Sequence, residues 1–401
     1  SAGVRQARIT GMQQVGRQTH LPQSTKEFFL NSTIRARIQK IRQRLAEGKL
    51  DALMVSVQEN RYYLSGFSGE DTQFDESAGT LFISDRHLVL ATDSRYELQA
   101  QAQAAGFEIV CYQKGLEKAL PGILNPLGIR RLGFEGVRVS YKNHASYANA
   151  CGQANPPVEL VPTENLVESL RQIKSEDEIQ ATIRALRLAE KAFKKVVETM
   201  APGMTEKQVA WNLEKTMREA GAQDLSFPVI VASGPNSALP HAVPTDRRLA
   251  PGEPILIDWG ARLDAYCSDT TRTVVMGRPD PCFNQVFQTV IEARDLAIAA
   301  IKAGISGTAV DAVARNHIQK NGFAGKFGHS LGHGTGLAVH EGPRLSPLKD
   351  DRLASGMVVT VEPGIYIPGW GGIRMENQVV VRQDKADVLN DPSPFYPQID
   401  I

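Results

Sequence analysis

The feature that most constrains the fold of this chain is a repeat within its C-terminal half. Residues 201–222 align with residues 302–323 at an offset of 101 positions. In each copy a glycine precedes a hydroxyl side chain, an apolar helical face follows, and a second glycine ends the segment, which is typical of a capped helix with a glycine stop. The matched pairs are Gly203 with Gly304, Thr205 with Ser306, Val209 with Val310, Met217 with Ile318, and Gly221 with Gly322.

The repeat continues into strand-like segments and matches acid with acid. At an offset of 104, PILIDWGARL lies over MVVTVEPGIYI and places Asp258 on Glu362. At an offset of 107, SDTTRTVV lies over MENQVVV and places Asp269 on Glu376. In each half the two segments are close enough in sequence to form an antiparallel hairpin. A two-fold repeat of helices and strands would therefore bring the four carboxylates together across a pseudo-symmetry axis.

Four carboxylates in one pocket indicate a metal site. An acid within an apolar strand is costly unless it is paired or bound to a metal, and four like charges do not converge unless cations hold them. Each acid alone could equally be a solvated turn residue or a helix cap. The symmetric arrangement favours the other interpretation, in which two divalent metal ions bind between the hairpins.

Histidines in a glycine-rich segment extend this site. GHSLGHGTGLAVHEGP contains His329, His333 and His340, and its glycines allow an imidazole to approach a ligand closely. At an offset of 99, His241 aligns with His340, whereas His333 aligns with a glycine. We expect His333 to be the fifth metal ligand, and His241 and His340 to face the substrate. A structural role is the usual one for a single histidine, and we expect it for His329.

Composition and charge narrow the classes of function. The chain has 45 basic and 44 acidic residues, which gives no support for binding to nucleic acid or to a membrane surface. No apolar run approaches the roughly 18 residues of a membrane span, and the polar N-terminus is unlike a secretory signal. Four cysteines without CxxC spacing indicate reduced thiols in a cytoplasmic protein.

The N-terminal half predicts a separate α/β domain. Strand-like segments alternate with helical ones, which favours a mostly parallel sheet, and no glycine-rich phosphate loop follows any of the strands. Ser175 and Glu178 form a capping box that opens a helix expected to run to about Thr199. The expected divisions are a poorly ordered tail over 1–24, an N-terminal domain over 25–168 and an α+β catalytic domain over 169–401.

Five short segments resemble the ligand motifs of the pita-bread metallopeptidases. They are ILIDWG, CSDTTRT, SLGHGTG, TVEPGIY and IRMENQ. That family includes aminopeptidase P, prolidase and methionine aminopeptidase, with creatinase as a metal-free relative. RYYLSGFSG and LATDSRYELQAQ are similar to the creatinase-type N-terminal domain, which implies the Xaa-Pro peptidase branch. The resemblance implies a pita-bread C-terminal domain with an internal pseudo-two-fold repeat. Asn377 departs from the family pattern, which usually has Asp there.

The resemblance also implies a metal arrangement. Two divalent ions, expected to be manganese with cobalt, zinc or iron as alternatives, would share a bridging hydroxide that acts as the nucleophile. Asp258 would bind one ion. Asp269 and Glu376 would bridge the two ions. His333 and Glu362 would complete the coordination of the second ion.

Further roles follow from the same resemblance. Glu362 is the expected general base, and His340 and His241 are expected to bind the substrate and stabilise the oxyanion. Arg374 would orient the ligands by a charge-assisted hydrogen bond, and Tyr366 would join it.

The function implied is hydrolysis of Xaa-Pro bonds at peptide N-termini, as in aminopeptidase P. Its substrates would be short peptides with proline in the second position, and the protein would be a homodimer or a larger homo-oligomer. The alternative is a prolidase that cuts only Xaa-Pro dipeptides. A non-catalytic pita-bread binding protein and a creatinase-like amidinohydrolase are disfavoured, because all five ligand residues are present.

Overall fold

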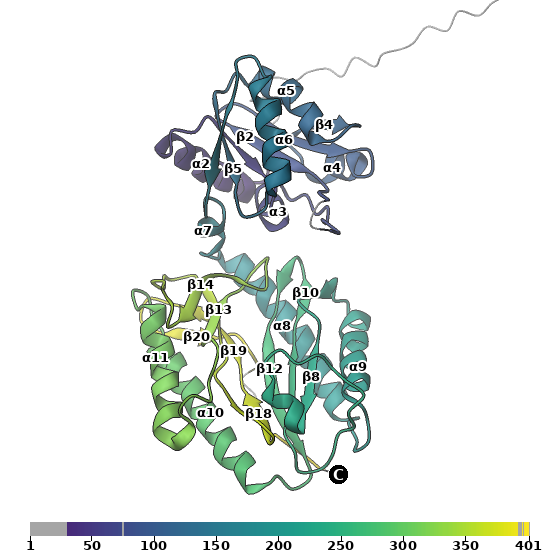
Figure 1. Ribbon diagram of the computed structural model, residues 1–401, viewed down its shortest axis with the longest axis vertical. Coiled ribbons are helices and arrows are strands. Elements are labelled where there is room, and N and C mark those ends of the chain that lie inside the picture. The colour runs from purple at the N-terminus through teal and green to yellow at the C-terminus, as the bar shows by residue number, and fades with distance from the viewer. Residues whose placement is uncertain (1–29, 74–75, 392–394, 396, 401) are drawn as a thin grey trace, which may run out of the picture. The chain divides into compact units, whose positions relative to one another are not determined.

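The structure is a computed structural model that describes residues 30–73, 76–391, 395 and 397–400. The tail predicted over residues 1–24 lies outside the described residues. The chain divides into two compact units, Ser1–Glu164 and Asn165–Ile401 (Figure 1). The predicted domain boundary, between residues 168 and 169, lies close to this division.

The N-terminal unit is built on a six-stranded sheet with the strand order β4-β3-β2-β1-β5-β6. Three neighbouring pairs are parallel and two are antiparallel. The strands are β1 (Ala52–Val55), β2 (Thr80–Ser84), β3 (Leu88–Asp93), β4 (Glu108–Tyr112), β5 (Arg131–Glu135) and β6 (Glu159–Thr163). The helices are α2 (Ser32–Glu47), α3 (Gln58–Ser65), α4 (Glu97–Gln103), α5 (Leu116–Leu127) and α6 (Tyr141–Gly152).

This architecture agrees with the predicted α/β domain, and the antiparallel pairing of β2 with β3 has a simple cause. Residues 85–87 are the only ones between β2 and β3, which is too few for the crossover that a parallel pair requires. Helix α2 begins at the N-cap Asn31 and packs with an apolar face of four isoleucine and leucine residues, all of them buried.

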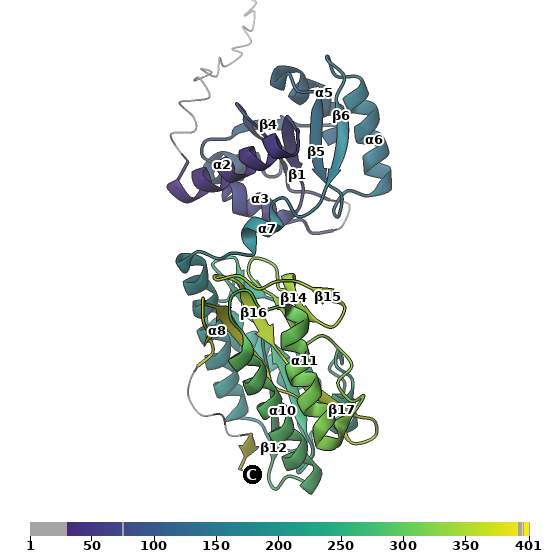
Figure 2. The same cartoon turned by 90° about the vertical axis from the view of Figure 1, so that its left-hand side faces the viewer.

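The C-terminal unit contains the repeat that the sequence predicts. Its first half places α8 (Glu176–Val197) and α9 (Glu206–Glu219) against β8 (Ile230–Ser233), β9 (Ile255–Trp259) and β12 (Thr270–Met276). Its second half places α10 (Pro281–Ala300) and α11 (Gly307–Ile318) against β13 (Gly332–Gly334), β16 (Val358–Val361) and β19 (Asn377–Val381). Figure 2 shows α10 and α11 side by side. Each half thus has its own hydrophobic core.

Equivalent contacts recur in the two halves. Gly203 and Gly304 have φ angles of 89° and 88°, in the left-handed region that favours glycine. The carbonyl of Gly203 accepts a hydrogen bond of 2.7 Å from Arg248, and that of Gly304 accepts one of 3.0 Å from Arg352. The predicted capping box of α8 is present, and the helix ends at Val197.

Shorter elements complete the C-terminal unit. The helical turns are α7 (Glu168–Arg171), η2 (Gly234–Ala238) and η3 (Gln319–Phe323). The remaining strands are β7 (Asp224–Leu225), β10 (Ala261–Leu263), β11 (Tyr266–Cys267), β14 (Glu341–Ser346), β15 (Lys349–Asp350), β17 (Gly364–Ile367), β18 (Gly371–Arg374), β20 (Ala386–Val388) and β21 (Gln398–Ile399). Among the described residues, none of the helices has the length and apolar content needed to span a bilayer.

Candidate metal centre and active site

Two antiparallel hairpins carry the four predicted carboxylates. In the first hairpin β9 pairs with β12, Asp258 lies opposite Thr271, and Asp269 immediately precedes β12. In the second hairpin β16 pairs with β19, and Glu362 and Glu376 stand at the ends of these strands. The hairpins meet where the Glu376 amide donates to the Thr271 carbonyl at 3.2 Å. The strand pairing predicted for each half is therefore present.

Three of these four acids form a tight cluster. One oxygen from each of Asp258, Asp269 and Glu376 lies within 4.8 Å of the others. Asp269 and Glu376 are only 5% and 1% exposed, so water screens their mutual repulsion poorly. Burial and the neighbouring negative charges raise the pKa of both side chains well above the usual range. Burial also raises the pKa of Asp258, and that of Glu362 to about 7.

His333 lies next to this cluster with one ring nitrogen directed at it. Its Nε2 is 3.6 Å from Asp269 Oδ2 and 3.4 Å from Glu362 Oε1. Nδ1 lies 3.0 Å from the Gly334 carbonyl, and this contact assigns the proton to Nδ1. Burial lowers the pKa of His333 to about 3, so the ring is neutral and Nε2 has a free lone pair. A neutral imidazole in this tautomer is a suitable metal ligand.

Arg374 connects the cluster to two of the other predicted residues. Its Nη2 donates to Asp258 Oδ2 at 2.7 Å, and its Nη1 donates to the Tyr366 hydroxyl at 2.9 Å. That hydroxyl lies 2.8 Å from Nε2 of His329, whose Nδ1 lies 2.8 Å from the Ser330 carbonyl. His329 and Tyr366 thus form a partly buried hydrogen-bonded chain that begins at Arg374.

Three polar residues that sequence reasoning missed hold the ligands in place. Thr271 Oγ1 donates to Glu376 Oε2 at 2.8 Å and accepts from Arg374 Nε at 3.1 Å. Thr360 Oγ1 donates to Glu362 Oε1 at 3.3 Å, and Gln378 Oε1 accepts from the Asp269 amide at 3.0 Å. The signal that could have identified them is the two-residue period of a strand, because each lies two residues from a predicted ligand.

Asn377, the departure from the family pattern, contacts a buried arginine. Its Oδ1 accepts a hydrogen bond of 3.3 Å from Arg272 Nη2, while Nη1 of that arginine donates to the Glu376 carbonyl. A neutral amide therefore stands where a carboxylate is usual, and it still accepts a hydrogen bond from Arg272.

A cavity of about 440 Å³ opens directly over the cluster. His241 and His340 line it from opposite halves of the repeat, and the His340 ring packs against His333 at a centroid distance of 4.4 Å. One wall is apolar and contains Phe227, Pro228 and Val229. Such a cavity, apolar with a few convergent polar groups, is typical of a small-ligand site. The structure thus brings all ten predicted site residues to the cavity or directly behind it.

The donor set fits divalent cations. Two buried carboxylate oxygens, Asp258 Oδ1 and Glu376 Oε1, have no hydrogen-bond partner among the described residues. A buried oxygen without a partner lowers the stability of the fold, unless a bound cation takes the place of the hydrogen-bond donor. Asp258 has one buried cationic partner, Arg374, and the other three carboxylates have no direct arginine or lysine partner in the described part of the chain. Carboxylate oxygens with one imidazole suit manganese and zinc alike.

A symmetric pair of hairpins that presents carboxylates and one histidine under a peptide-sized cavity defines a pita-bread metallopeptidase. The chain belongs to metallopeptidase family M24, whose family model matches residues 180–383. The model of the creatinase/prolidase N-terminal domain matches residues 37–173. The predicted fold class, and the prediction that the chain is a metallopeptidase, are confirmed.

Several known proteins are similar over nearly the whole chain. An uncharacterized peptidase, YqhT of Bacillus subtilis, is 40% identical over 348 residues, which are 87% of this chain and 96% of that protein. The structure of an Xaa-Pro dipeptidase from Bacillus anthracis is 37% identical with a TM-score of 0.85, over 92% of this chain and 100% of that one. The structure of an X-Pro aminopeptidase from Thermotoga maritima is 36% identical with a TM-score of 0.80, over 89% and 100%.

Proposed function

We propose that this protein is an exopeptidase that hydrolyses Xaa-Pro bonds in short peptides. The observation that carries the proposal is the convergence of five ligand-type side chains beneath the cavity that contains His241 and His340. The apolar wall of Phe227, Pro228 and Val229 suits the pyrrolidine ring of proline. Similar proteins that are named Xaa-Pro dipeptidase and X-Pro aminopeptidase support the same bond specificity.

The proposed metal ligands are the five residues predicted from the sequence. Asp258 would hold one divalent ion, and Glu362 and His333 would hold the second. Asp269 and Glu376 would serve both ions, as the resemblance implies. We propose manganese as the metal. When bound, the ions would supply Lewis acidity toward the scissile carbonyl and activation of water.

The remaining steps belong to side chains of this protein. Glu362 stands at the end of β16, faces the cavity, and accepts a hydrogen bond from Thr360 that fixes its carboxylate. In this position it can take a proton from the attacking water and pass it to the leaving proline nitrogen. His340 and His241 face the same cavity, where their N–H groups can donate to the oxyanion that develops at the scissile carbonyl.

Two activities remain candidates for this site. The sequence resemblance favours removal of an N-terminal residue from longer peptides. One feature of the cavity favours a dipeptidase: Arg344 lines it, and the Arg344 guanidinium has no ion pair or hydrogen bond in the described part of the chain. A free cation of this kind suits the terminal carboxylate of an Xaa-Pro dipeptide, which lies near the scissile bond only when proline is the last residue.

Steady-state kinetics of the metal-loaded enzyme test the proposal. We expect hydrolysis of Ala-Pro or Ala-Pro-Gly and none of Ala-Gly. A ratio of kcat/KM that favours the tripeptide would establish the aminopeptidase, and turnover of the dipeptide alone would establish the dipeptidase. Glu362→Gln should abolish turnover of both peptides. Inactivity toward all Xaa-Pro peptides after loading with manganese, cobalt or zinc would overturn the proposal.

We also propose that the enzyme works as a homodimer or larger homo-oligomer in the cytoplasm. The cytoplasmic assignment is supported by the four cysteines, which are all free thiols. Sedimentation of the purified chain tests the oligomeric state, and a single species of 43.8 kDa would contradict it.

A further inference from the structure

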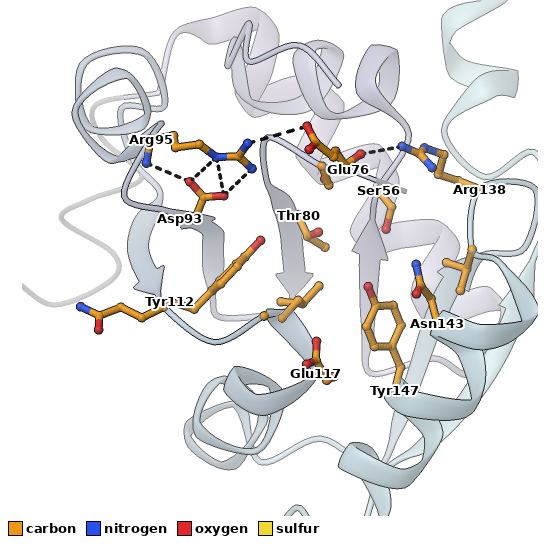
Figure 3. A pocket seen from close by; sticks show the side chains of 15 residues that line it. Ser56, Glu76, Thr80, Asp93, Arg95, Tyr112, Glu117, Arg138, Asn143 and Tyr147 are labelled. Atoms are coloured by element: carbon orange, nitrogen blue, oxygen red, sulfur yellow. Dashed lines mark hydrogen bonds and ion pairs between the residues drawn. The ribbon is translucent and has the colours of Figure 1, made fainter. Parts of the chain in front are cut away.

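A second cavity, of about 370 Å³, lies in the N-terminal unit and shares no residue with the candidate active site (Figure 3). It opens at one edge of the six-stranded sheet. Ser56 follows β1, Asp93 ends β3, Tyr112 ends β4, and Thr80 begins the antiparallel strand β2 at the same edge. The cavity therefore lies at the carboxyl ends of the parallel strands.

The strand order makes this edge a natural binding crevice. The connection from β3 leads to its neighbour β4 at one end of the sheet. Helix α5 then connects β4 to β5, which lies on the other side of β1, and α6 connects β5 to β6. Crossovers that leave in opposite directions open a crevice at the carboxyl ends of the strands, where open α/β sheets bind ligands. The first turn of α5 and the side chains of α6 line this cavity, as that geometry requires.

Hydrogen-bonding groups with no partner face the cavity. The Tyr112 and Tyr147 hydroxyls and the Asn143 side-chain amide have no hydrogen-bond partner within the described ranges of the chain. Burial raises the pKa of Tyr112 to about 12 and also raises that of Tyr147, so both phenols keep their protons. Polar groups that are partly buried and unpaired are available to a ligand.

The charges of the cavity are divided between two ends. At one end, Arg95 binds Asp93 at 2.9 Å and its Nη1 lies 3.7 Å from Glu76 Oε2. Arg138 at the same end donates to the Glu76 carbonyl at 3.0 Å and lies 3.4 Å from Asp71 Oδ2. At the other end, Glu117 in the first turn of α5 has neither a hydrogen-bond donor nor a cationic partner among the described residues. Figure 3 shows Glu117 separated from the two arginines, with Tyr112 and Tyr147 between them.

The backbone brings the Glu117 carboxylate to this position. Gly115, the N-cap of α5, has φ of 90°, and a Cβ atom there would lie 2.5 Å from Glu117 Oε2. The carboxylate folds over this glycine at the helix N-terminus. Because an acid already occupies that end of the helix, a ligand group placed there must be a cation rather than an anion.

We propose that this cavity binds a small zwitterion, an amino acid or a dipeptide, with its ammonium group at Glu117 and its carboxylate toward Arg95. Asp93 accepts from Nε and Nη2 of Arg95, and Glu76 lies 3.7 Å from Nη1, which is beyond hydrogen-bond distance. The guanidinium, with five N–H groups, therefore keeps N–H groups that can donate to a ligand carboxylate. The two phenols and the Asn143 amide would bind the polar groups between the ends. The volume of the cavity is at the small end of the range for ligand sites, which suits a molecule of this size. This inference does not depend on the catalytic proposal.

Calorimetric titration of the full chain with glycylglycine tests this site. We expect saturable binding that weakens about tenfold or more in Glu117→Gln, in line with the loss of a charge-assisted hydrogen bond. N-acetylglycylglycine, which lacks the ammonium group, and glycylglycinamide, which lacks the carboxylate, should each bind at least tenfold more weakly than the parent dipeptide. Tyr147→Phe, which removes one hydroxyl, should weaken binding about threefold or more.

Two control variants separate binding in this cavity from a general effect of surface charge and from binding at the metal cluster. Asp85→Asn removes one acid from the exposed β2–β3 turn and should bind as the unmodified chain does. Asp269→Asn disrupts the metal cluster. It should not change the heat of glycylglycine binding that is lost in Glu117→Gln. The proposal is overturned if glycylglycine does not bind at millimolar concentration, if Glu117→Gln and Tyr147→Phe bind normally, or if binding is lost only in Asp269→Asn.

Discussion

Arg374 donates a hydrogen bond of 2.7 Å from Nη2 to Asp258 Oδ2, and both side chains are buried. The same guanidinium donates to the Thr271 hydroxyl and to the Tyr366 hydroxyl. Arg374, at the end of β18 in the second half of the repeat, thus fixes a carboxylate of the first half. This contact joins the two halves of the repeat at the point where the metal ligands meet.

Replacement of Arg374 by Met should damage both stability and metal binding. It leaves the buried Asp258 carboxylate without its cation, which costs on the order of 3–5 kcal/mol in unfolding free energy. Affinity for manganese should fall roughly 10–100-fold, as for other residues that orient ligands. Tyr366→Phe is the matched control, because it removes only a hydroxyl and should cost about 1 kcal/mol. Urea unfolding and metal titration measure both quantities, and equal effects of the two variants would contradict this role.

Thr271→Val should weaken metal binding although the two side chains have nearly the same shape. The substitution removes the hydroxyl that donates to Glu376 Oε2 at 2.8 Å. We expect roughly tenfold lower manganese affinity and a stability cost of about 1–3 kcal/mol, because a buried acceptor loses its donor. Thr271→Ser keeps the hydroxyl and should retain most of the affinity. Similar losses in both variants would show that the methyl group, rather than the hydrogen bond, is what matters.

In the metal-free protein, ionisation of Glu362 should lower the free energy of unfolding as the pH rises. Its folded pKa of about 7 is raised above the ordinary value of 4.5 by burial. The contribution of Glu362 to stability is therefore complete below about pH 4.5 and is lost as the pH rises through 7, by up to roughly 3 kcal/mol. With chelator present, Glu362→Gln should melt several degrees above the unmodified chain at pH 8 and much closer to it at pH 5. A difference in Tm that stays constant between these pH values would contradict this interpretation.

Arg344→Met should distinguish the two candidate activities. If Arg344 binds the carboxylate of a dipeptide, KM for Ala-Pro should rise about tenfold or more, while KM for Ala-Pro-Gly amide should change little. Arg86→Met, at an exposed position of the N-terminal unit, is the control for loss of a positive charge. An equal rise in KM for both peptides would argue against a carboxylate contact.

Glu341 forms a buried ion triad beside His340, and its loss should be costly. Glu341 Oε2 lies 2.5 Å from Arg171 Nη2, and its Oε1 contacts Lys174, which is 5% exposed as a residue. Glu341→Gln would remove the carboxylate that pairs with both buried cations and should cost on the order of 3–5 kcal/mol. Glu253→Gln, which breaks the more exposed pair with Arg247, should cost clearly less in the same urea titration. Similar costs would show that burial does not control the strength of these pairs.

Much of the fold and the site could be predicted because the relevant patterns are local or repeated. The glycine positions and the capping box of Ser175 specify helix ends, and the matched acids Asp258 and Glu362 specify equivalent strands. The antiparallel pairing of β2 with β3 follows from the short connection between them, although the alternation of strands and helices alone favours a parallel sheet.

The remaining features depend on contacts between distant segments. Thr271 and Gln378 lie within the motifs CSDTTRT and IRMENQ, but their hydrogen bonds to ligand residues of the other hairpin exist only when the two hairpins lie beside each other. Likewise, Arg344 could not be placed in the cavity until β14 had been placed against β13. Sequence patterns identify which side chains can bind a metal, whereas the three-dimensional arrangement identifies the residues that hold them.

We propose above all that one divalent metal centre is formed by Asp258, Asp269, His333, Glu362 and Glu376. Metal analysis of the chelated and manganese-reconstituted chain, followed by calorimetric titration, tests it most directly. We predict about two manganese ions per chain in the unmodified protein, and loss of both in Asp269→Asn, because this carboxylate belongs to both groups of ligands. Retention of both ions in Asp269→Asn, or failure of the unmodified chain to bind divalent metal, would contradict the claim.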